Sequence, residues 1–367
     1  RLSDEAALRI LEERRGANYD PLVVDTFAKV YPEVALRELE SASQSEAVIS
    51  VESLGELERL RGICRRLDLP ADVCLRINPG TGAEAARLQM AGVTQFGMDE
   101  TSAREAMALC LSDPYLNWVG FHCYMGTQIL SHSQVLSNTR LGLEMMTHLA
   151  RTFNVNVKLA DIGGGLGVPY HDGDQAIDLP ALAGGLRSLL AEALTTPWFR
   201  SCRFIMELGR YLVAEAGVYV CMVVDVKRHR ERRFVVADGG INHFFPAGAI
   251  GRVVRRDFPL VAITPRQGES VSTVDVVGPL CTPLDVLGKN VALPPVEPGD
   301  LICIPRAGAY GYSASPLLWL GHPTPGEILV RDGEFFAVRE PGEADDVMAG
   351  QRLPPSSFLR AAQIHSA

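Results

Sequence analysis

Lysine is scarce in this chain, and long apolar runs are absent. Only four of the 367 residues are lysine, and the formal net charge is −9. This charge disfavours nucleic acid or an anionic membrane surface as the main partner. No apolar run reaches the ~20 residues that a membrane span needs, and the first residues show no signal-peptide pattern. These absences predict a cytoplasmic protein that uses neither a membrane nor a nucleic acid as its partner.

The cysteines lack the spacing of a metal site. None of the eight belongs to a C-x-x-C pair, and Cys74, Cys221 and Cys303 lie inside apolar, strand-like runs. The pattern predicts reduced thiols, with neither a disulfide framework nor a zinc site. The basic residues form one cluster, KRHRERR at 227–233, between two apolar runs. A hairpin turn exposed to water explains this cluster more simply than an anion-binding patch does.

The rhythm of apolar residues divides the chain into three parts. Residues 1–45 have apolar residues at helical spacing. Residues 46–212 alternate short β-rich runs with helical stretches, which predicts a parallel sheet with helical crossovers. Residues 213–367 contain apolar β runs separated by glycine and proline, which predicts an antiparallel β domain. A chain of 367 residues that is 47% hydrophobic and 22% charged is long and apolar enough for two cores.

Within the second part the pattern predicts five clear strands, one weak strand and three helices. The weak strand lies at 94–99. The clear strands lie at 47–51, 72–79, 117–126, 157–165 and 202–210. The helices lie at 53–67, 100–111 and 135–153.

Two motifs at predicted strand ends carry groups that suit a phosphorylated ring. In DIGGG, Gly163, Gly164 and Gly165 follow a strand, and glycines let backbone N–H groups approach a phosphate. A tight turn explains the same glycines equally well. In MELGR, Glu207 can pair with a protonated ring nitrogen and Arg210 can bind phosphate. A simple ion pair between these two residues is the alternative.

Two further motifs are weaker when each is taken alone. In FHCYMGTQ, His122 and Tyr124 stand two residues apart on a strand and so share one face, where a flat side chain can stack on a flat cofactor. A lone histidine on a strand is more often a core residue. Cys281 lies in the Gly/Pro loop GPLCTPLD, and a buried free thiol is its ordinary interpretation.

The order and spacing of these motifs together resemble the fold type III pyridoxal-phosphate decarboxylases, the family of ornithine, arginine and diaminopimelate decarboxylases. The resemblance runs from about Val51 to Phe336. It implies a (β/α) TIM-type barrel, incomplete in this chain, followed by the antiparallel β domain. It also implies pyridoxal 5′-phosphate as the cofactor and amino-acid decarboxylation as the activity.

The resemblance assigns roles to particular residues. Glu207 pairs with the pyridine nitrogen. Tyr124 stands where the family has its ring-stacking histidine, and Thr127 stands where it has a serine near the phosphate. The remaining cofactor contacts are assigned to Gly163, Gly164, Gly165, Gly209, Arg210 and Tyr310.

Cys281 and Asp285 match the loop that reaches the partner subunit's active site in this family, which implies a homodimer with these two residues in catalysis. Thr282 stands where an acidic residue usually reads the distal amine of the substrate, and Leu208 replaces the usual proline after Glu207. These departures resemble the branch acting on carrier-protein-linked glutamyl groups or the exosortase-associated branch. The expected substrate is therefore an amino acid or a carrier-linked aminoacyl group without a distal cationic amine.

The lysine that anchors the cofactor as a Schiff base has no evident counterpart. In the family it ends the first barrel strand in a motif like YAVKAN. Lys29, in DTFAKVYP, lies just over twenty residues before Glu52, too close for the intervening units of a barrel of ~250 residues. We interpret Lys29 as an exposed helix lysine and expect two or three βα units to be missing. The first forty residues look unrelated to the family; the stretch AALRILEERRGANYDPLVVDTF at 6–27 is similar instead to the closing helices of HD-GYP phosphohydrolases, without their metal ligands.

The sequence therefore predicts a decarboxylase impaired by the loss of this lysine. The alternative is a non-catalytic relative that binds the cofactor or regulates an active decarboxylase subunit. A remnant without activity is the third possibility.

Overall fold

The structure is a computed structural model that describes residues 47–80, 88–89, 92–171, 173–248, 256–263 and 270–352. The chain forms two compact units. The first contains the residues up to Gly167 together with Ala176–Leu208, and the second contains Val168–Gln175 and the residues from Gly209 onward. The helical segment expected at 1–45 lies outside the described residues, as does Lys29.

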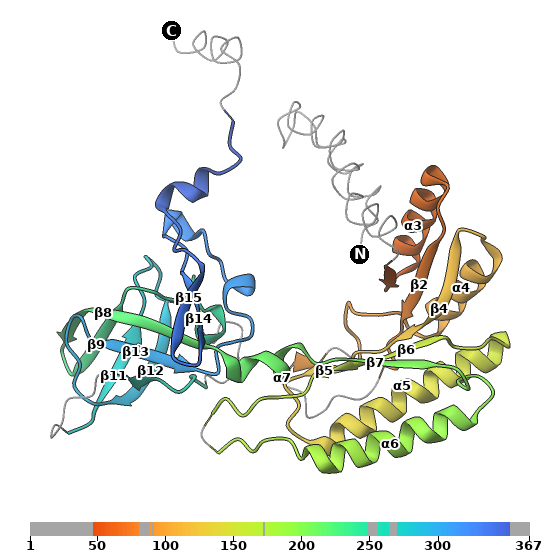
Figure 1. The fold of residues 1–367 in the computed structure, drawn as a ribbon, viewed down its shortest axis with the longest axis horizontal. Coiled ribbons are helices and arrows are strands. Elements are labelled where there is room, and N and C mark those ends of the chain that lie inside the picture. The colour runs from red at the N-terminus through yellow and green to blue at the C-terminus, as the bar shows by residue number, and fades with distance from the viewer. Residues whose placement is uncertain are drawn as a thin grey trace, which may run out of the picture. The chain divides into compact units, whose positions relative to one another are not determined.

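The first unit is built on a parallel sheet of five strands (Figure 1). In spatial order these are β1 (Val48–Val51), β2 (Ala71–Arg76), β4 (Leu116–His122), β6 (Leu159–Gly164) and β7 (Arg203–Glu207). All five clear strands of the sequence prediction are present. The weak one at 94–99 is reduced to a single parallel bridge between Ile77 and Met98.

Four helices connect these strands: α3 (Leu54–Leu67), α4 (Glu100–Ser112), α5 (His132–Phe153) and α6 (Leu179–Thr195). Each begins at a polar residue whose side chain accepts a backbone N–H of the first turn, as Ser53 and Asp178 do. The sequence prediction missed α6, although Asp178 followed by Pro180 is a typical helix start. Two short strands, β3 (Leu88–Gln89) and β5 (Gly126–Thr127), form a separate antiparallel pair.

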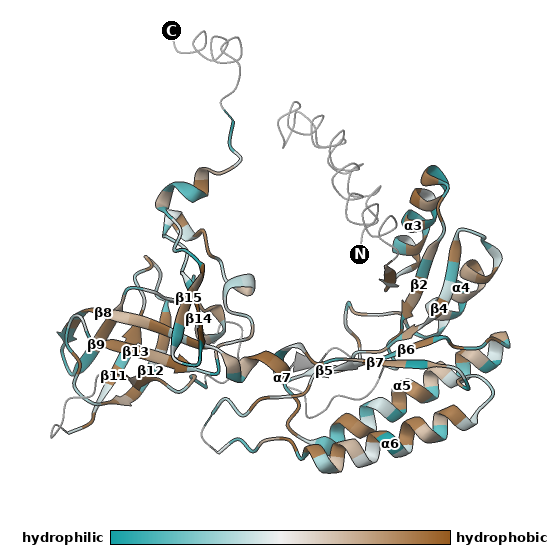
Figure 2. Ribbon diagram, in the orientation of Figure 1, coloured by the Kyte–Doolittle hydropathy of each residue, from teal (hydrophilic) through white to brown (hydrophobic). Residues whose placement is uncertain are grey.

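Apolar side chains fill the space between the sheet and its helices. Leu57, Leu75 and Phe121 are completely buried, and α5 and α6 alternate apolar and polar residues along their length (Figure 2). Each such side chain contributes ~1.5–3 kcal/mol when it is fully buried. The apolar core therefore lies between the sheet and its helices, and the polar groups of the candidate site lie at one edge of the sheet.

The second unit is a six-stranded sheet in the order β10-β13-β8-β9-β11-β12. The predicted antiparallel pairing is confirmed for every neighbouring pair except β9 and β11, which run parallel because a crossover links them. The strands are β8 (Val218–His229), β9 (Arg232–Ala237), β10 (Val261–Ala262), β11 (Ser272–Val277), β12 (Val286–Leu293) and β13 (Leu301–Pro305).

The basic cluster at 227–233 forms the predicted hairpin. His229 pairs with Arg232 across a turn in which Arg230 has a φ of 54°. A separate hairpin joins β14 (Glu327–Arg331) to β15 (Glu334–Arg339), and one helical turn, α7 (Gly209–Val213), opens the unit. All eight cysteines are free. Among the described residues, no helix is long and apolar enough to cross a membrane.

Candidate cofactor site

Five charged or titratable side chains gather at the carboxyl edge of the parallel sheet. Glu52 follows β1, and Arg76, His122 and Glu207 are the last residues of β2, β4 and β7. Asp161 lies in β6, in register with His122. Parallel strands place their carboxyl ends at one edge, which is where barrel enzymes build their sites. The sequence analysis singled out Glu207 here and treated His122 as a core residue.

His122, Asp161 and Glu207 form the centre of this edge. The His122 Nε2 lies 3.8 Å from a Glu207 carboxylate oxygen, and one ligand atom from each of the three residues lies within 4.8 Å of the others. The other ring nitrogen of His122 forms a 2.9 Å hydrogen bond with the Ser50 hydroxyl. The Nε2 is buried and has no hydrogen-bond partner among the described residues.

Burial at this edge of the sheet changes the proton affinity of His122 and of Asp161. Burial, together with the nearby Arg76 guanidinium, lowers the pKa of His122 to about 4. Burial raises the pKa of Asp161 to about 6, and the neighbouring Glu207 charge adds to the increase. Arg76 itself donates to Glu52 at 2.9 Å. Asp161 and Glu207 therefore form a negatively charged pair that a positive partner stabilises.

The glycine run Gly163–Gly165, at the carboxyl end of β6, makes a turn that favours glycine. Gly163 and Gly165 have φ values of +69° and +81°. The Gly163 N–H donates to the Asp161 carboxylate at 2.8 Å, which closes the turn. A Cβ on Gly163 would lie 2.7 Å from the Cys123 carbonyl oxygen. The tight-turn interpretation is thus correct for these glycines, and it leaves their backbone close to the polar edge.

The turn packs against the segment that carries the other predicted ring contacts. A Cβ on Gly163 would lie 2.9 Å from the Tyr124 ring, and Gly164 lies directly against the backbone carbonyl of Glu207. A Cβ on Gly165 would lie 3.5 Å from the Thr127 Cα. The first unit therefore brings together Tyr124, Thr127, the three glycines and Glu207.

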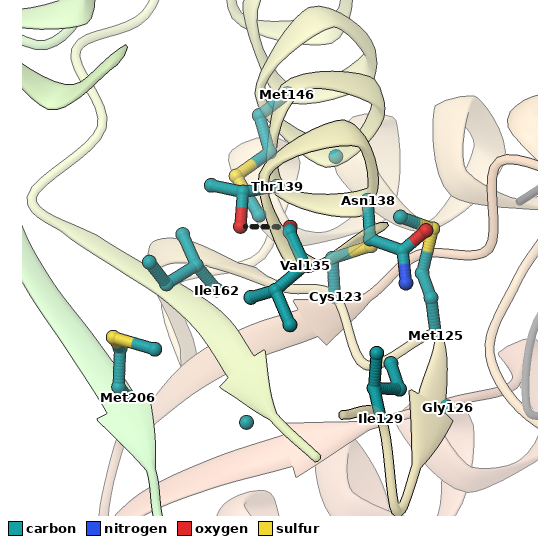
Figure 3. Close-up of a pocket in the computed structure, with 12 residues that line it drawn as sticks. Cys123, Met125, Gly126, Ile129, Val135, Asn138, Thr139, Met146, Ile162 and Met206 are labelled. Atoms are coloured by element: carbon teal, nitrogen blue, oxygen red, sulfur yellow. Dashed lines mark hydrogen bonds between the residues drawn. The ribbon is translucent and has the colours of Figure 1, made fainter. Parts of the chain in front are cut away.

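A small apolar cavity lies beneath this turn, between α5 and the sheet (Figure 3). Its volume is about 20 Å³, which is room for one water molecule. The Thr139 hydroxyl, on its wall, is used by a 2.9 Å hydrogen bond to the Val135 carbonyl (Figure 3). The cavity is too small for any cofactor, so the open polar edge is the better site. Its lining includes Cys123, Met125, Ile129, Met146, Ile162 and Met206.

In the second unit, Arg210 lies between two tyrosines. Its guanidinium donates to the Tyr170 hydroxyl at 3.2 Å and lies 4.5 Å from the centre of the Tyr310 ring. The Arg210 Nε is buried without a hydrogen-bond partner among the described residues. The sequence analysis predicted Arg210 and Tyr310 and missed Tyr170, which no motif marks. Gly209 is exposed directly before Arg210.

Cys281 and Asp285 differ sharply in environment. Cys281 is a free, exposed thiol. Asp285 is only 2% exposed, and its carboxylate accepts the backbone N–H groups of Ile241 and Leu280, each at 2.8 Å. Gly278 contacts the same carboxylate. Asp285 thus ties down the loop that carries Cys281, and its oxygens are already in use.

Two comparisons of sequence define the class of this protein. The family model "Pyridoxal-dependent decarboxylase, pyridoxal binding domain" matches residues 17–214. The chain is 36% identical over 327 residues to L-glutamyl-[BtrI acyl-carrier protein] decarboxylase of Niallia circulans, covering 88% of this chain and 76% of that relative. The chain belongs to the pyridoxal-dependent decarboxylase family, and its cofactor is pyridoxal 5′-phosphate. The predicted family and cofactor are confirmed.

Solved structures confirm the predicted fold class. The diaminopimelate decarboxylase of Helicobacter pylori, whose structure was determined with L-lysine, superimposes with a TM-score of 0.74 at 28% identity, covering 85% of this chain and 75% of that one. The diaminopimelate decarboxylase of M. jannaschii gives a TM-score of 0.76 at 25% identity, covering 87% and 72%.

The residues present fit this cofactor. The cradle at Gly163–Gly165 leaves backbone close to the polar edge where side chains would otherwise stand. Glu207 offers a carboxylate to a protonated ring nitrogen. The assignment of Arg210, which belongs to the second unit, to the phosphate stays a prediction.

The family match also bears on the anchoring amine. It includes two of the four lysines, Lys29 and Lys158. Lys158 is exposed and directly precedes β6, so it lies at the opposite end of that strand from the glycine turn. Within the matched residues, Lys29 is therefore the remaining candidate for the anchor.

Proposed function

We propose that this chain decarboxylates a glutamyl group carried by an acyl-carrier protein. The identity of 36% to a carrier-protein-linked glutamyl decarboxylase supports this substrate class. So does Thr282, which offers no charge to a distal amine. The observation that carries the reaction type is the Glu207 carboxylate beside the Gly163 turn at the carboxyl edge of the sheet.

The bound cofactor acts as the electron sink for the bond that breaks. Glu207 would hold the proton on the ring nitrogen of the bound cofactor. The Tyr124 ring, which packs on Gly163, would support one face of the cofactor, and the Thr127 hydroxyl would donate to its phosphate. The family resemblance assigns Arg210 and Tyr310 to the phosphate as well.

In this proposal Lys29 is the amine that anchors the cofactor. This assignment replaces the earlier interpretation of Lys29 as an exposed helix lysine. The support is the family match from residue 17 and the position of Lys158 at the wrong end of β6. The contrary predictions are an impaired enzyme without an anchor and a non-catalytic relative that regulates an active subunit.

Cys281 is the residue we assign to catalysis in a partner's site, within a homodimer. Its exposure leaves the thiol available to another chain. Asp285 acts as a positioning residue, because its carboxylate is consumed by two backbone amides. Sedimentation should give a dimer.

The deciding experiment is borohydride reduction of the protein loaded with pyridoxal phosphate, followed by peptide mass spectrometry, beside a decarboxylase assay on a glutamyl-loaded carrier protein. We expect the label at Lys29, and release of carbon dioxide from the carrier-linked glutamyl group but not from diaminopimelate. Lys158→Arg is the matched control and should keep both the label and the activity. A loaded protein without any reducible label would support the impaired enzyme instead.

A further inference from the structure

The cluster of His122, Asp161 and Glu207 has the donor set of a metal centre. We propose that these three side chains bind a divalent transition-metal ion, such as Zn²⁺ or Co²⁺, when the cofactor is absent. Their ligand atoms lie within 4.8 Å of one another. The proposal goes beyond decarboxylation and does not depend on it.

The ligand types select the class of ion. One imidazole nitrogen with two carboxylates suits Zn²⁺, Co²⁺, Mn²⁺ or Fe²⁺, whereas Mg²⁺ and Ca²⁺ prefer oxygen ligands alone. Bonds of about 2.0–2.2 Å place ligand atoms of a tetrahedral site roughly 3.3–3.6 Å apart. The His122–Glu207 separation of 3.8 Å exceeds this range only slightly. Because the Glu207 side chain is 50% exposed, it is free to close the gap.

The unpartnered nitrogen of His122 is an independent reason to expect a ligand. His122 is only 8% exposed, and its Nε2 has no hydrogen-bond partner among the described residues. A buried polar atom left in this state destabilises the folded chain, because it has lost its water and gained no partner. Its position beside two carboxylates is explained if a cation joins the three groups.

The second ring nitrogen supports the same assignment. The 2.9 Å hydrogen bond between Nδ1 and the Ser50 hydroxyl holds the ring in place. If Nδ1 donates its proton to Ser50, the Nε2 lone pair faces Asp161 and Glu207. Histidines that bind metals are usually oriented by a hydrogen bond of this kind on the other nitrogen.

The site would be open on one side. Three protein ligands with a fourth position left to water are typical of exchangeable or catalytic zinc sites. The side chain of Glu207 is 50% exposed, so water can reach the fourth position beside it. If Glu207 also pairs with the ring nitrogen, a consequence that rests on the proposed function, the metal and the cofactor exclude each other.

The test is a Co²⁺ titration of the full, cofactor-free chain, followed by visible absorption and calorimetry. We expect one ion per chain with the absorption bands of a four- or five-coordinate site. Glu207→Gln should weaken binding by at least ~100-fold, since even outer ligand partners contribute 10–100-fold, and Ser50→Ala should weaken it by ~10-fold. His148→Ala is the matched control, because His148 lies 3.1 Å from Glu100 on the exposed surface. It should bind Co²⁺ as the parent does.

Circular dichroism should show that Glu207→Gln is folded like the parent, because the substitution alters a half-exposed side chain. A loss of Co²⁺ binding can then be assigned to the missing ligand. Absence of the Co²⁺ bands in the parent chain, or bands that persist in folded Glu207→Gln, would overturn the proposal. Pyridoxal phosphate separates the two proposals. Co²⁺ binding by a chain that never takes up pyridoxal phosphate would leave the metal site in place and refute the decarboxylase, and the reverse result would refute only the metal site.

Discussion

Two buried polar groups, one in each unit, differ in whether their hydrogen bonds are satisfied. In the second unit the Asp285 carboxylate accepts two backbone N–H groups at 2.8 Å and is almost inaccessible. In the first unit the His122 Nε2 is also buried, and it has no hydrogen-bond partner among the residues described. A satisfied group holds a fold together, and an unsatisfied one costs stability until a ligand arrives. The comparison separates residues that build the molecule from residues that serve its ligands.

Removing the satisfied carboxylate should have the largest effect. Asp285→Ala leaves two buried amides without acceptors, each ~1.5–3 kcal/mol for a charged hydrogen bond. We expect the free energy of unfolding of the β unit to fall by about 4 kcal/mol in urea titration. Asp285→Asn keeps one acceptor and should lose about half as much. Glu231→Ala is the control, because this side chain is 93% exposed, and it should change stability by less than about 0.5 kcal/mol. A loss as large as that of Asp285→Ala would contradict the difference between buried and exposed polar groups.

Glu207→Gln should lower the activity and leave the stability unchanged, whereas Asp285→Ala should lower the stability. The side chain is 50% exposed, so its stability contribution is small, and we expect the unfolding transition to stay in place. The amide cannot hold the ring nitrogen protonated, and kcat should fall by ~100-fold, in the range seen when one preorganised electrostatic partner is removed. Decarboxylation of the carrier-linked glutamyl group is the measurement. Activity within a factor of three of the parent would show that Glu207 does not touch the cofactor.

The glycine turn should lie between these extremes, because it serves both fold and ligand. Gly163→Ala forces a side chain into a φ of +69° and against the Cys123 carbonyl. We expect a loss of ~1–3 kcal/mol in thermal unfolding. Gly184→Ala, inside α6 with open space around its Cβ, is the matched control and should stabilise the helix by ~0.5–1 kcal/mol. Equal effects of the two substitutions would contradict the strained turn.

The sequence predicted the strands well and the roles of single residues less well. Alternating apolar runs define β1, β2, β4, β6 and β7, because burial against helices leaves a local pattern. The parallel pairing of β9 with β11 and the contact of Arg210 with Tyr170 depend on segments distant in the chain. No local pattern encodes them.

The same distinction explains the site. Glu207 and the glycines follow strands and were predicted, whereas the unpartnered state of His122 depends on the register of β4 with β6. Asp161, two residues before Gly163, carried a usable signal, since an aspartate in that position commonly closes a turn. The identity of the anchoring amine stays a prediction. The spacing between Lys29 and Glu52 argues against Lys29, whereas the family match, which includes residue 29, argues for it.

The smallest effect on stability should come from exposed polar groups that contact neither the core nor a ligand. Glu100 and Arg104 form an exposed ion pair of 2.7 Å one turn apart on α4. Exposed pairs at this spacing contribute little to stability, because water screens the charges and ordering two long side chains costs entropy. A double-mutant cycle of Glu100→Ala and Arg104→Ala should give a coupling close to the error of the measurement, and the coupling should weaken further at 1 M salt. A coupling as large as the effect of Gly163→Ala would show that exposure does not distinguish charges that stabilise the fold from charges that do not.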